Sequence, residues 1–319
     1  MNKLISKTFT LILAVLLFFS AGVKGGNFYP KGMVTGYAHT TTVLLSGKIL
    51  IVGGYSTTSL STARVFNPNA NAVTPTGNME HATRIWHVAT LLPNGKVLIT
   101  GGAVKAGLTS SAELYDPATN NFTPAGVMAT ARYAHTTTVL PSGKVLIVGG
   151  YNAGQLSSAE LYDPNTNTFT PTGAMQNKRV WHTATLLPSG KVLIAGGGIG
   201  KTYLSSAELY DPTTGNFTAT GTMEGGKYWH TATLLSSGKV LIMGGNTQTG
   251  YTSTAELYDP TTGAFTSTNS LRTKRGNHAA TLLHDGQILI EAGISNDQNT
   301  LLEELYDPNM PLVTDTSAS

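Results

Sequence analysis

The sequence of 319 residues predicts an all-β protein with the fold of a six-bladed β-propeller. Three observations support this prediction: a motif that returns six times at nearly constant spacing, a Gly-centred turn inside each copy, and few charged residues. Charged residues make up 12% of the chain, which is about half of the usual share. Such a composition suits short strands joined by turns better than long surface helices.

The first 25 residues have the order of a secretory signal peptide. Lys3 and Lys7 precede the apolar run Leu11–Phe19, and small residues follow it. This order is typical of an export signal, and the apolar run is too short to span a bilayer comfortably. We expect a signal peptide over residues 1–25, cut within residues 22–26, and export to the periplasm or the extracellular space. The alternative is an uncleaved membrane anchor.

The repeat begins with a stretch such as HTTTVLLSGKILIVGG, which starts at His39. Related stretches start at five more histidines, spaced 48, 48, 47, 48 and 48 residues apart: His87, His135, His182, His230 and His278. A second block recurs in step, as AELYDP at Ala112, Ala159, Ala207 and Ala255, as EELYDP at Glu303, and as the weaker ARVFNP at Ala63. Self-similarity at a fixed period indicates a repeat architecture.

Each repeat is expected to form four strands. The first runs from the histidine to the turn, for instance His182–Leu187, and the Ser/Asn/Asp–Gly turn predicts a hairpin. The second, KVLIVGG, is continuously apolar, which fits a strand buried on both faces. The third, AELYDP, ends at proline, because proline cannot continue a ladder. The fourth is short and surrounds an aromatic residue: Phe122, Phe169, Phe217 and Phe265.

Four short antiparallel strands per repeat correspond to one propeller blade. A single blade cannot bury both faces, so blades stack on one another around an axis. We predict one propeller over residues 27–308 and a C-terminal tail over residues 309–319. The predicted blades are residues 34–79, 84–128, 132–175, 179–223, 227–271, and 275–308 completed by residues 27–32.

The short stretch GNFYPKG, residues 26–32, supplies the strand that the sixth repeat lacks. The sixth repeat ends in NMPLVTDTSAS and has no counterpart of NFTPTG. Phe28 matches Phe122 and Phe217, so we expect residues 27–32 to pair with Leu305–Tyr306 as the outer strand of the sixth blade. The alternative is a disordered linker, since chain termini often fray.

The double glycine followed by Tyr-Asp-Pro and an aromatic residue resembles the Kelch repeat, over nearly the whole chain after the leader. The double glycine recurs as Gly53–Gly54, Gly101–Gly102, Gly149–Gly150, Gly196–Gly197 and Gly244–Gly245. The final aromatic, usually Trp in that family, is Phe here, and the sixth repeat has Ala292–Gly293. The resemblance implies a propeller fold and a role as an interaction platform.

Charge and cysteine content exclude several classes of protein. The net charge is +3, but Lys3, Lys7 and Lys24 lie in or beside the leader, so the mature chain is close to neutral. A nucleic-acid partner is therefore not expected. The absence of cysteine excludes disulfides, thiolate metal sites and the Tyr–Cys copper centre of galactose-oxidase-like propellers. We expect a monomer with no cofactor and no membrane span after signal cleavage.

One face of the predicted propeller varies from repeat to repeat. The connections between second and third strands read YSTTSLST, AVKAGLTS, YNAGQLSS, GIGKTYLS and NTQTGYTS, whereas the turns at the opposite end are nearly identical. We interpret this face, which also carries the connections between blades, as the specialised one. The alternative is simple drift of surface loops.

A basic residue stands three positions before most repeat histidines: Arg84, Arg132, Arg179, Lys227 and Arg275. These residues either form a cationic mouth for an anionic sugar or carboxylate, or pair with the glutamate of the third strand in the same blade. The first repeat has Gly36 in place of the base and Arg64 in place of the acid. This joint loss favours the internal pair.

Aromatic residues lie beside the same histidines. Trp86, Trp181 and Trp229 directly precede a repeat histidine, and Tyr133 stands one place further back. They are suited to stacking on sugars, anchoring a protein or packing between blades. The candidate ligand-binding set is Arg84, Trp86, Arg132, Tyr133, Arg179, Trp181, Lys227, Trp229 and Arg275. The six histidines are expected to lie too far apart to share a metal ion.

The leading hypothesis is an exported, non-enzymatic binding module for a glycan or a protein. The alternative is a carbohydrate-active enzyme similar to the sialic-acid mutarotases, which are small secreted Kelch propellers. The sequence holds no Ser–His–Asp signature, His-Glu-x-x-His or phosphate loop, and no acid was identified that departs from the repeat in the manner of a general base. A subunit of a larger surface assembly is a third possibility.

Overall fold

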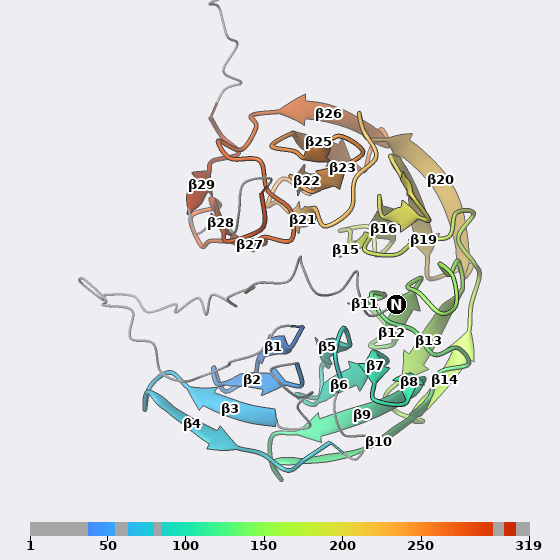
Figure 1. Cartoon of the computed structure of the whole chain (residues 1–319), viewed down its shortest axis with the longest axis vertical. Helices are drawn as coiled ribbons and strands as arrows, with labels where there is room; N and C mark the ends of the chain where they lie inside the picture. The colour runs from blue at the N-terminus through green and yellow to red at the C-terminus, as the bar shows by residue number, and fades with distance from the viewer. Residues whose placement is uncertain (1–37, 55–62, 80–83, 296–302, 311–319) are drawn as a thin grey trace, which may run out of the picture. The chain divides into compact units, whose positions relative to one another are not determined.

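The computed structural model describes residues 38–54, 63–79, 84–295 and 303–310. Within these residues the chain forms strands and turns, with no helix, and six antiparallel sheets follow one another along the chain (Figure 1). The predicted fold class, an all-β propeller of six blades, is confirmed. The predictions for the signal peptide, for residues 27–32 as a closing strand and for most of the tail fall outside the described residues.

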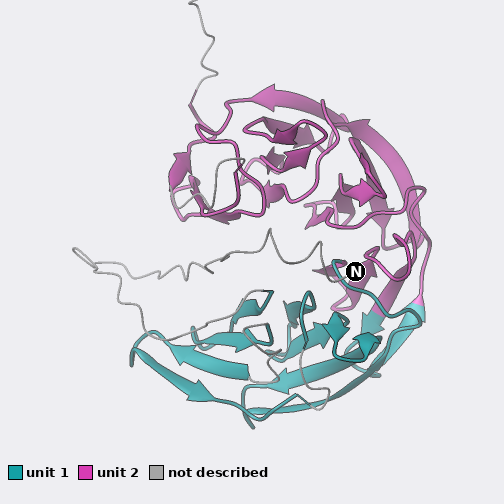
Figure 2. Cartoon of the chain, viewed as in Figure 1, with its two compact units in different colours: residues 1–134, 162–170 teal, residues 135–161, 171–319 magenta. Residues whose placement is uncertain are grey.

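The chain divides into two compact units, residues 1–134 with 162–170 and residues 135–161 with 171–319 (Figure 2). The first unit contains two complete four-stranded sheets, ordered β1-β2-β3-β4 and β10-β9-β6-β5. Their strands are β1 (Thr40–Val43), β2 (Ile49–Val52), β3 (Ala63–Asn67), β4 (Ala72–Pro75), β5 (Val88–Leu91), β6 (Val97–Thr100), β9 (Ser111–Asp116) and β10 (Asn121–Val127).

The second unit contains the fourth, fifth and sixth sheets. The fourth is β15 (Thr183–Leu186), β16 (Val192–Ala195), β19 (Ser206–Asp211) and β20 (Asn216–Thr222), and the fifth is β21 (Thr231–Leu234), β22 (Val240–Met243), β25 (Ala255–Asp259) and β26 (Ala264–Thr268). The sixth has three strands among the described residues: β27 (Ala279–Leu282), β28 (Ile288–Glu291) and β29 (Glu304–Tyr306).

The third sheet draws residues from both units. It consists of β11 (Thr136–Val139), β12 (Val145–Val148), β13 (Ala159–Asp163) and β14 (Thr168–Pro171), in that order. Every sheet thus repeats the hairpin, third strand and, except in the sixth, fourth strand that the sequence predicts.

The second strand of each blade is the centre of the core. All four residues of β16 and of β22 are buried, as expected for a continuously apolar strand between two layers. Between the fourth and fifth sheets, Ala195 and Met223 pack with Val240, Ile242 and Tyr258. Burial of such side chains stabilises the stack by about 25 cal/mol per Å² of apolar surface.

The third and fourth strands are joined by an aromatic pair on the outer part of each blade. The ring centroids of Tyr210 and Phe217 are 4.8 Å apart, and those of Tyr258 and Phe265 are also 4.8 Å apart. In the turn between the strands, Asp211 Oδ1 accepts a hydrogen bond from the Thr213 N–H at 2.9 Å. The fourth strands predicted around these phenylalanines are therefore confirmed.

The connections between second and third strands are more ordered than the sequence suggested. Three of them form small hairpins: β7–β8 (Ala103–Val104, Gly107–Leu108), β17–β18 (Gly198–Ile199, Thr202–Tyr203) and β23–β24 (Asn246–Thr247, Gly250–Tyr251). The chain entering each blade bridges to the base of the hairpin, as Val180 does to Gly198 and Tyr228 to Asn246. We call these hairpins, with the entering segments that bridge to them, the hairpin end of the blades.

Candidate functional site

The basic residue of the repeat is buried against the third-strand glutamate of its own blade. The shortest N···O distances are 2.7 Å for Arg84–Glu113, 2.9 Å for Arg179–Glu208, 2.7 Å for Lys227–Glu256 and 2.6 Å for Arg275–Glu304. None of these four cations is more than 1% exposed. Arg132 is also buried and donates to the Thr130 carbonyl at 3.3 Å. Burial therefore favours the internal ion pair over a cationic mouth.

Arg179 shows how the terminal nitrogens of these cations are engaged. Its Nη1 donates to the carbonyls of Gly196 and Ser206, both at 2.8 Å, and its Nη2 donates to Ser206 Oγ and Glu208 Oε1. Glu208 also accepts from the N–H groups of Gln176 and Asn177. Burial lowers the pKa of Arg179, while Glu208 opposes the change. The guanidinium thus ties together the second strand, the third strand and the entering segment.

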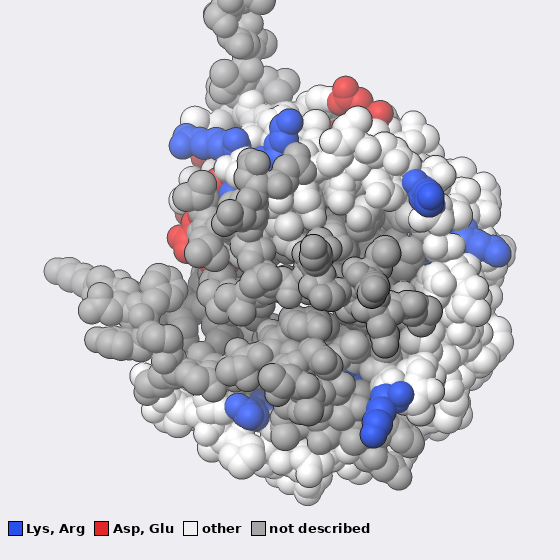
Figure 3. Space-filling view, viewed as in Figure 1, with Lys and Arg blue, Asp and Glu red and all other residues white. Residues whose placement is uncertain are grey.

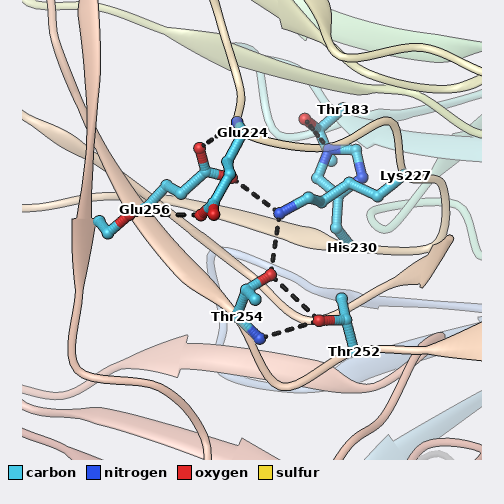
Figure 4. Close-up of polar contacts among 8 residues, drawn as sticks. Thr183, Glu224, Lys227, His230, Thr252, Thr254 and Glu256 are labelled. Atoms are coloured by element: carbon cyan, nitrogen blue, oxygen red, sulfur yellow. Dashed lines mark hydrogen bonds and ion pairs between the residues drawn. The ribbon is translucent and has the colours of Figure 1, made fainter.

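Lys227 performs the same task in the fifth blade (Figure 4). Its Nζ donates to Glu256 Oε2 at 2.7 Å and to Thr254 Oγ1 at 3.1 Å. The second carboxylate oxygen of Glu256 accepts from the Glu224 N–H at 2.7 Å. A lysine therefore replaces arginine here with fewer hydrogen bonds but with the same charge compensation.

The repeat histidines connect neighbouring blades. Hydrogen bonds join Nε2 of four of these histidines to the first-strand threonine of the preceding blade at 2.8–3.0 Å: Thr40–His87, Thr136–His182, Thr183–His230 and Thr231–His278. Burial, followed by the nearby basic residue, lowers the pKa of His87, His182 and His230 to about 3 and that of His278 to about 4. These imidazoles are neutral at physiological pH. Within the described ranges no three His, Asp or Glu side chains converge as metal ligands.

The residue before each repeat histidine lies in the left-handed backbone region. Its φ lies between 52° and 62° in all six blades: Ala38, Trp86, Ala134, Trp181, Trp229 and Asn277. Backbone hydrogen bonds link some of these positions, with Asn277 N donating to Trp229 O at 2.8 Å and Trp86 N to Ala38 O at 3.4 Å. A positive φ costs roughly 1–2 kcal/mol for a residue with a Cβ. The fixed backbone thus carries side chains that range from alanine to tryptophan.

Aromatic side chains gather at the hairpin end of the fourth and fifth blades. The aromatic cluster consists of Trp181, Tyr203, Tyr228 and Trp229, all half-buried. Its ring centroids are 5.8 Å apart for Trp181–Trp229, 4.8 Å for Tyr203–Tyr228 and 4.8 Å for Tyr228–Trp229. In the first unit, Trp86 and Tyr133 form a separate pair at 5.2 Å. The structure thus brings the predicted tryptophans of these two blades together and adds two tyrosines.

Polar groups line the same cluster. Asn246 Nδ2 donates to the Tyr228 hydroxyl at 3.1 Å, and burial together with Tyr203 raises the pKa of Tyr228. Tyr251 lies beside the cluster, its ring against Gly276, where an added Cβ would come within 3.0 Å of it. Lys and Arg side chains are scattered over the described part of the face in Figure 3, and some have Asp or Glu side chains beside them. The cluster and Asn246 consist of Trp, Tyr and Asn side chains, which carry no charge at neutral pH.

Several residues of this site were not identified from the sequence. Tyr203, Asn246 and Tyr251 stand in connections that differ between repeats, so no register pointed to them. A usable signal was the aromatic residue at matching hairpin places in two successive blades, Tyr203 in TYLS and Tyr251 in GYTS.

Glu291 is an acid that departs from the repeat, contrary to the expectation that no acid does so in the manner of a general base. Its place holds Val52, Thr100, Val148, Ala195 or Met243 in the other blades. Glu291 is 2% exposed, and its Oε2 has no hydrogen-bond partner within the described residues. Burial, and then the charge of Glu303, raises its pKa.

The Kelch motif matches residues 132–176 and 184–224, which form most of the third and fourth blades. No curated protein matches the chain. The described residues include no helix that is long and apolar enough to cross a membrane. The other blades repeat the same glycine pairs, buried second strands and Tyr-Asp-Pro turns as the two matched blades, and the chain is accordingly a Kelch-repeat β-propeller protein.

Proposed function

We propose that this protein is an exported, non-enzymatic interaction module that binds a glycan or a protein through the hairpin end of its blades. One observation carries the proposal. The residue before each repeat histidine keeps the same left-handed backbone in all six blades, yet its side chain varies from Ala38 to Trp229. A constant backbone that presents changing side chains is the arrangement expected of a recognition surface on a rigid scaffold.

The invariant groups of the repeat support the same interpretation. Four of the basic residues are held by glutamates, and four of the histidines are neutral and bonded to threonines. These groups are occupied in holding blades together and are poorly placed for acid–base chemistry. The variable hairpins and aromatic rings remain for recognition, in keeping with the interaction role suggested by Kelch propellers.

Export is part of the proposal and rests on the leader. The basic start and apolar run within residues 1–25 predict a cleaved signal peptide. Expression in a bacterial host followed by N-terminal sequencing of the exported protein tests it. The prediction is a mature N-terminus within residues 22–27, and retention of Met1 on the exported chain would contradict it.

The absence of native cysteine allows a direct test of the binding face. Thr249→Cys places a single thiol on the tip of hairpin β23–β24, and Thr261→Cys places one on the exposed turn between β25 and β26. Each variant is coupled to a bulky maleimide polymer and applied to glycan and protein-fragment arrays. The polymer attached to the Thr249→Cys variant should abolish binding, whereas the polymer attached to the Thr261→Cys variant should preserve it. The reverse pattern would contradict the proposed face.

Glu291 favours a second function, that of a carbohydrate-active enzyme. A buried carboxyl with a raised pKa is a common property of catalytic acids and bases. An anomerisation assay with sialic acid tests this alternative. Rate acceleration that is lost in Glu291→Gln would support the enzyme, whereas glycan binding without acceleration would support the module.

A further inference from the structure

We propose that the aromatic cluster, with Asn246 and Tyr251, binds a neutral sugar ring of a glycan. This inference rests on the proposed binding function and assigns to it a ligand class and a place. The site lies within the second unit and is built from the entering segments of the fourth and fifth blades and from hairpins β17–β18 and β23–β24.

The aromatic rings provide the apolar part of such a site. Trp229 contacts Trp181 edge-on, with a 73° interplanar angle, and Tyr228 at a 53° tilt. All three rings are only half-buried, so part of their surface remains accessible to a ligand. The C–H face of a sugar ring packs on exposed aromatic surface, while its hydroxyl groups project toward polar neighbours.

The polar neighbours have the complementary hydrogen-bonding capacity. Asn246 uses one N–H in its bond to Tyr228, and a side-chain amide has a second N–H donor and a carbonyl acceptor. The Tyr228 hydroxyl accepts that bond and is also hydrogen-bonded with the Tyr203 hydroxyl, so the two phenols together keep one free O–H donor and free lone pairs. A sugar hydroxyl also donates and accepts, so these groups match it without any ionised partner.

The buried cations beside the cluster are already compensated, whereas Lys201 at the tip of hairpin β17–β18 is exposed. Lys227 directly precedes Tyr228, yet its ammonium lies 2.7 Å from Glu256 and is 1% exposed (Figure 4). Arg179 stands two residues before Trp181 and is bound to Glu208. An anionic sugar would have to take these cations from their glutamates, which would leave buried carboxylates unpaired. The chemistry therefore favours a neutral sugar.

The site is held rigidly before any ligand arrives. Trp229 is fixed by the bond from Asn277 N to its carbonyl, and Tyr228 by its bridge to Asn246. The tips of the two hairpins are joined, since Gln248 Nε2 donates to the Lys201 carbonyl at 2.6 Å. Rigid placement reduces the entropy lost on binding.

Trp229→Gly separates binding from folding, because glycine adopts a φ of 57° without strain. The control is Asn71→Gly, which makes a change to glycine at a φ of 47° in the turn between β3 and β4, away from the hairpin end. Wild type and both variants are titrated with the best-bound member of a panel of neutral gluco-, manno- and galacto-oligosaccharides. Melting temperatures of both variants are measured in parallel.

We expect Trp229→Gly and Asn246→Ala to weaken neutral-sugar binding at least tenfold, and Asn71→Gly to leave it within twofold. The melting temperature of Trp229→Gly should stay within a few degrees of wild type. Failure of every neutral oligosaccharide to bind, or equal loss in both glycine variants, would overturn the inference.

Two further outcomes distinguish this inference from the proposed function. Preference for sialylated glycans that is lost in Lys201→Ala, the exposed cation of the neighbouring hairpin, would overturn the neutral-sugar assignment. Binding of a protein fragment alone, blocked at Thr249→Cys, would also overturn it. In both cases the proposed function, recognition through the hairpin end, would stand.

Discussion

Within the described residues, four blades each bury one cation against one glutamate. The pair is surrounded by backbone groups, as the contacts of Arg179 with Gly196, Ser206 and Glu208 show. A buried pair of this kind adds little net stability over an apolar substitute, but removal of one partner leaves an uncompensated charge. The cations are therefore scaffold residues, and their loss should lower the stability of the fold before it weakens ligand binding.

Arg179→Met should lower the free energy of unfolding by about 3–5 kcal/mol, because Glu208 loses its cation while remaining buried. Urea unfolding measures the change. The control is Lys191→Met, which breaks the exposed Lys191–Asp211 pair at 3.1 Å and should cost about 1 kcal/mol or less. Equal effects of the two substitutions would show that burial does not govern the Arg179 pair.

Glu291→Met should raise the melting temperature at pH 7, because a methionine, Met243, is accommodated at the matching position of the fifth blade. A buried carboxylate with an oxygen that accepts no hydrogen bond costs free energy that an apolar side chain does not. The folded-state pKa of Glu291 is raised, so the cost is absent below the unfolded pKa and appears as pH rises through the folded pKa. Calorimetry at pH 7 and at pH 4 should therefore show a gain that shrinks in acid, and a destabilised variant at pH 7 would contradict this account.

At the scale of elements, the sixth sheet ends at β29 and has no fourth strand among the described residues. Leu305 on β29 is 62% exposed, whereas Leu257 at the same place in β25 is half-buried and packs in the core between the fifth and sixth sheets. The sequence of residues 27–32 has the aromatic residue that the fourth strands of other blades share. The closing strand stays a prediction, and the exposed Leu305 lies on the strand with which it would pair.

Deletion of residues 27–32 should lower the melting temperature by many degrees if they complete the sixth blade. An unpaired edge also exposes apolar surface and free ladder groups, so the deleted protein should aggregate on heating. Deletion of residues 311–319 serves as the control. An unchanged melting curve after removal of residues 27–32 would remove the closing-strand hypothesis.

The strands were predictable from the sequence because their signals recur in register. The turn after Leu187, the apolar run of β16 and the proline after Asp211 each mark a boundary, and the structure places them as expected. The hairpins were not predictable as elements, because Gly198–Tyr203 and Asn246–Tyr251 share few residues. Their short ladders depend on tertiary contact with the entering segments, as at Val180 and Tyr228.

The candidate site was only partly predictable for the same reason. The joint absence of base and acid from the first repeat indicated the Arg–Glu pair, because the two residues recur together at fixed positions of the other repeats. Trp181 and Trp229 were predictable from their position before the histidine. The contact of Tyr203 with Tyr228 was not, because it depends on how a variable hairpin folds back. Glu291 is distinguishable in the sequence as the one acid at a position that holds Val, Thr, Ala or Met in the other repeats, but the apolar strand around it indicates a core position rather than a site.

At the scale of the whole molecule, the buried histidines predict a stability that falls in acid. Their folded pKa values of about 3–4 lie below the unfolded value of 6.5, so the unfolded chain takes up protons first as pH decreases. The stability is complete above pH 6.5 and is lost as pH falls toward 3, by up to about 1.4 kcal/mol per pH unit for each histidine.

The urea midpoint of unfolding should therefore decrease steadily from pH 7 to pH 5. The pKa values of Asp211 and Asp259 are lowered, owing first to turn N–H groups and then to lysines. These two groups therefore change the stability only at lower pH. Lys227 and His278 are the charged or titratable neighbours that lower the pKa of His230. His230→Gln should flatten the profile, and a level midpoint between pH 7 and pH 5 in the wild type would contradict neutral buried histidines.

The central claim is that recurring residues of the repeat hold the blades together while the hairpin end recognises the ligand. Hydrogen–deuterium exchange of the wild-type protein, with and without the tightest ligand found on the arrays, tests it most directly. The account predicts ligand protection in residues 198–204, 225–230 and 246–251. Protection confined to the opposite turns, residues 187–191 and 235–239, would contradict it.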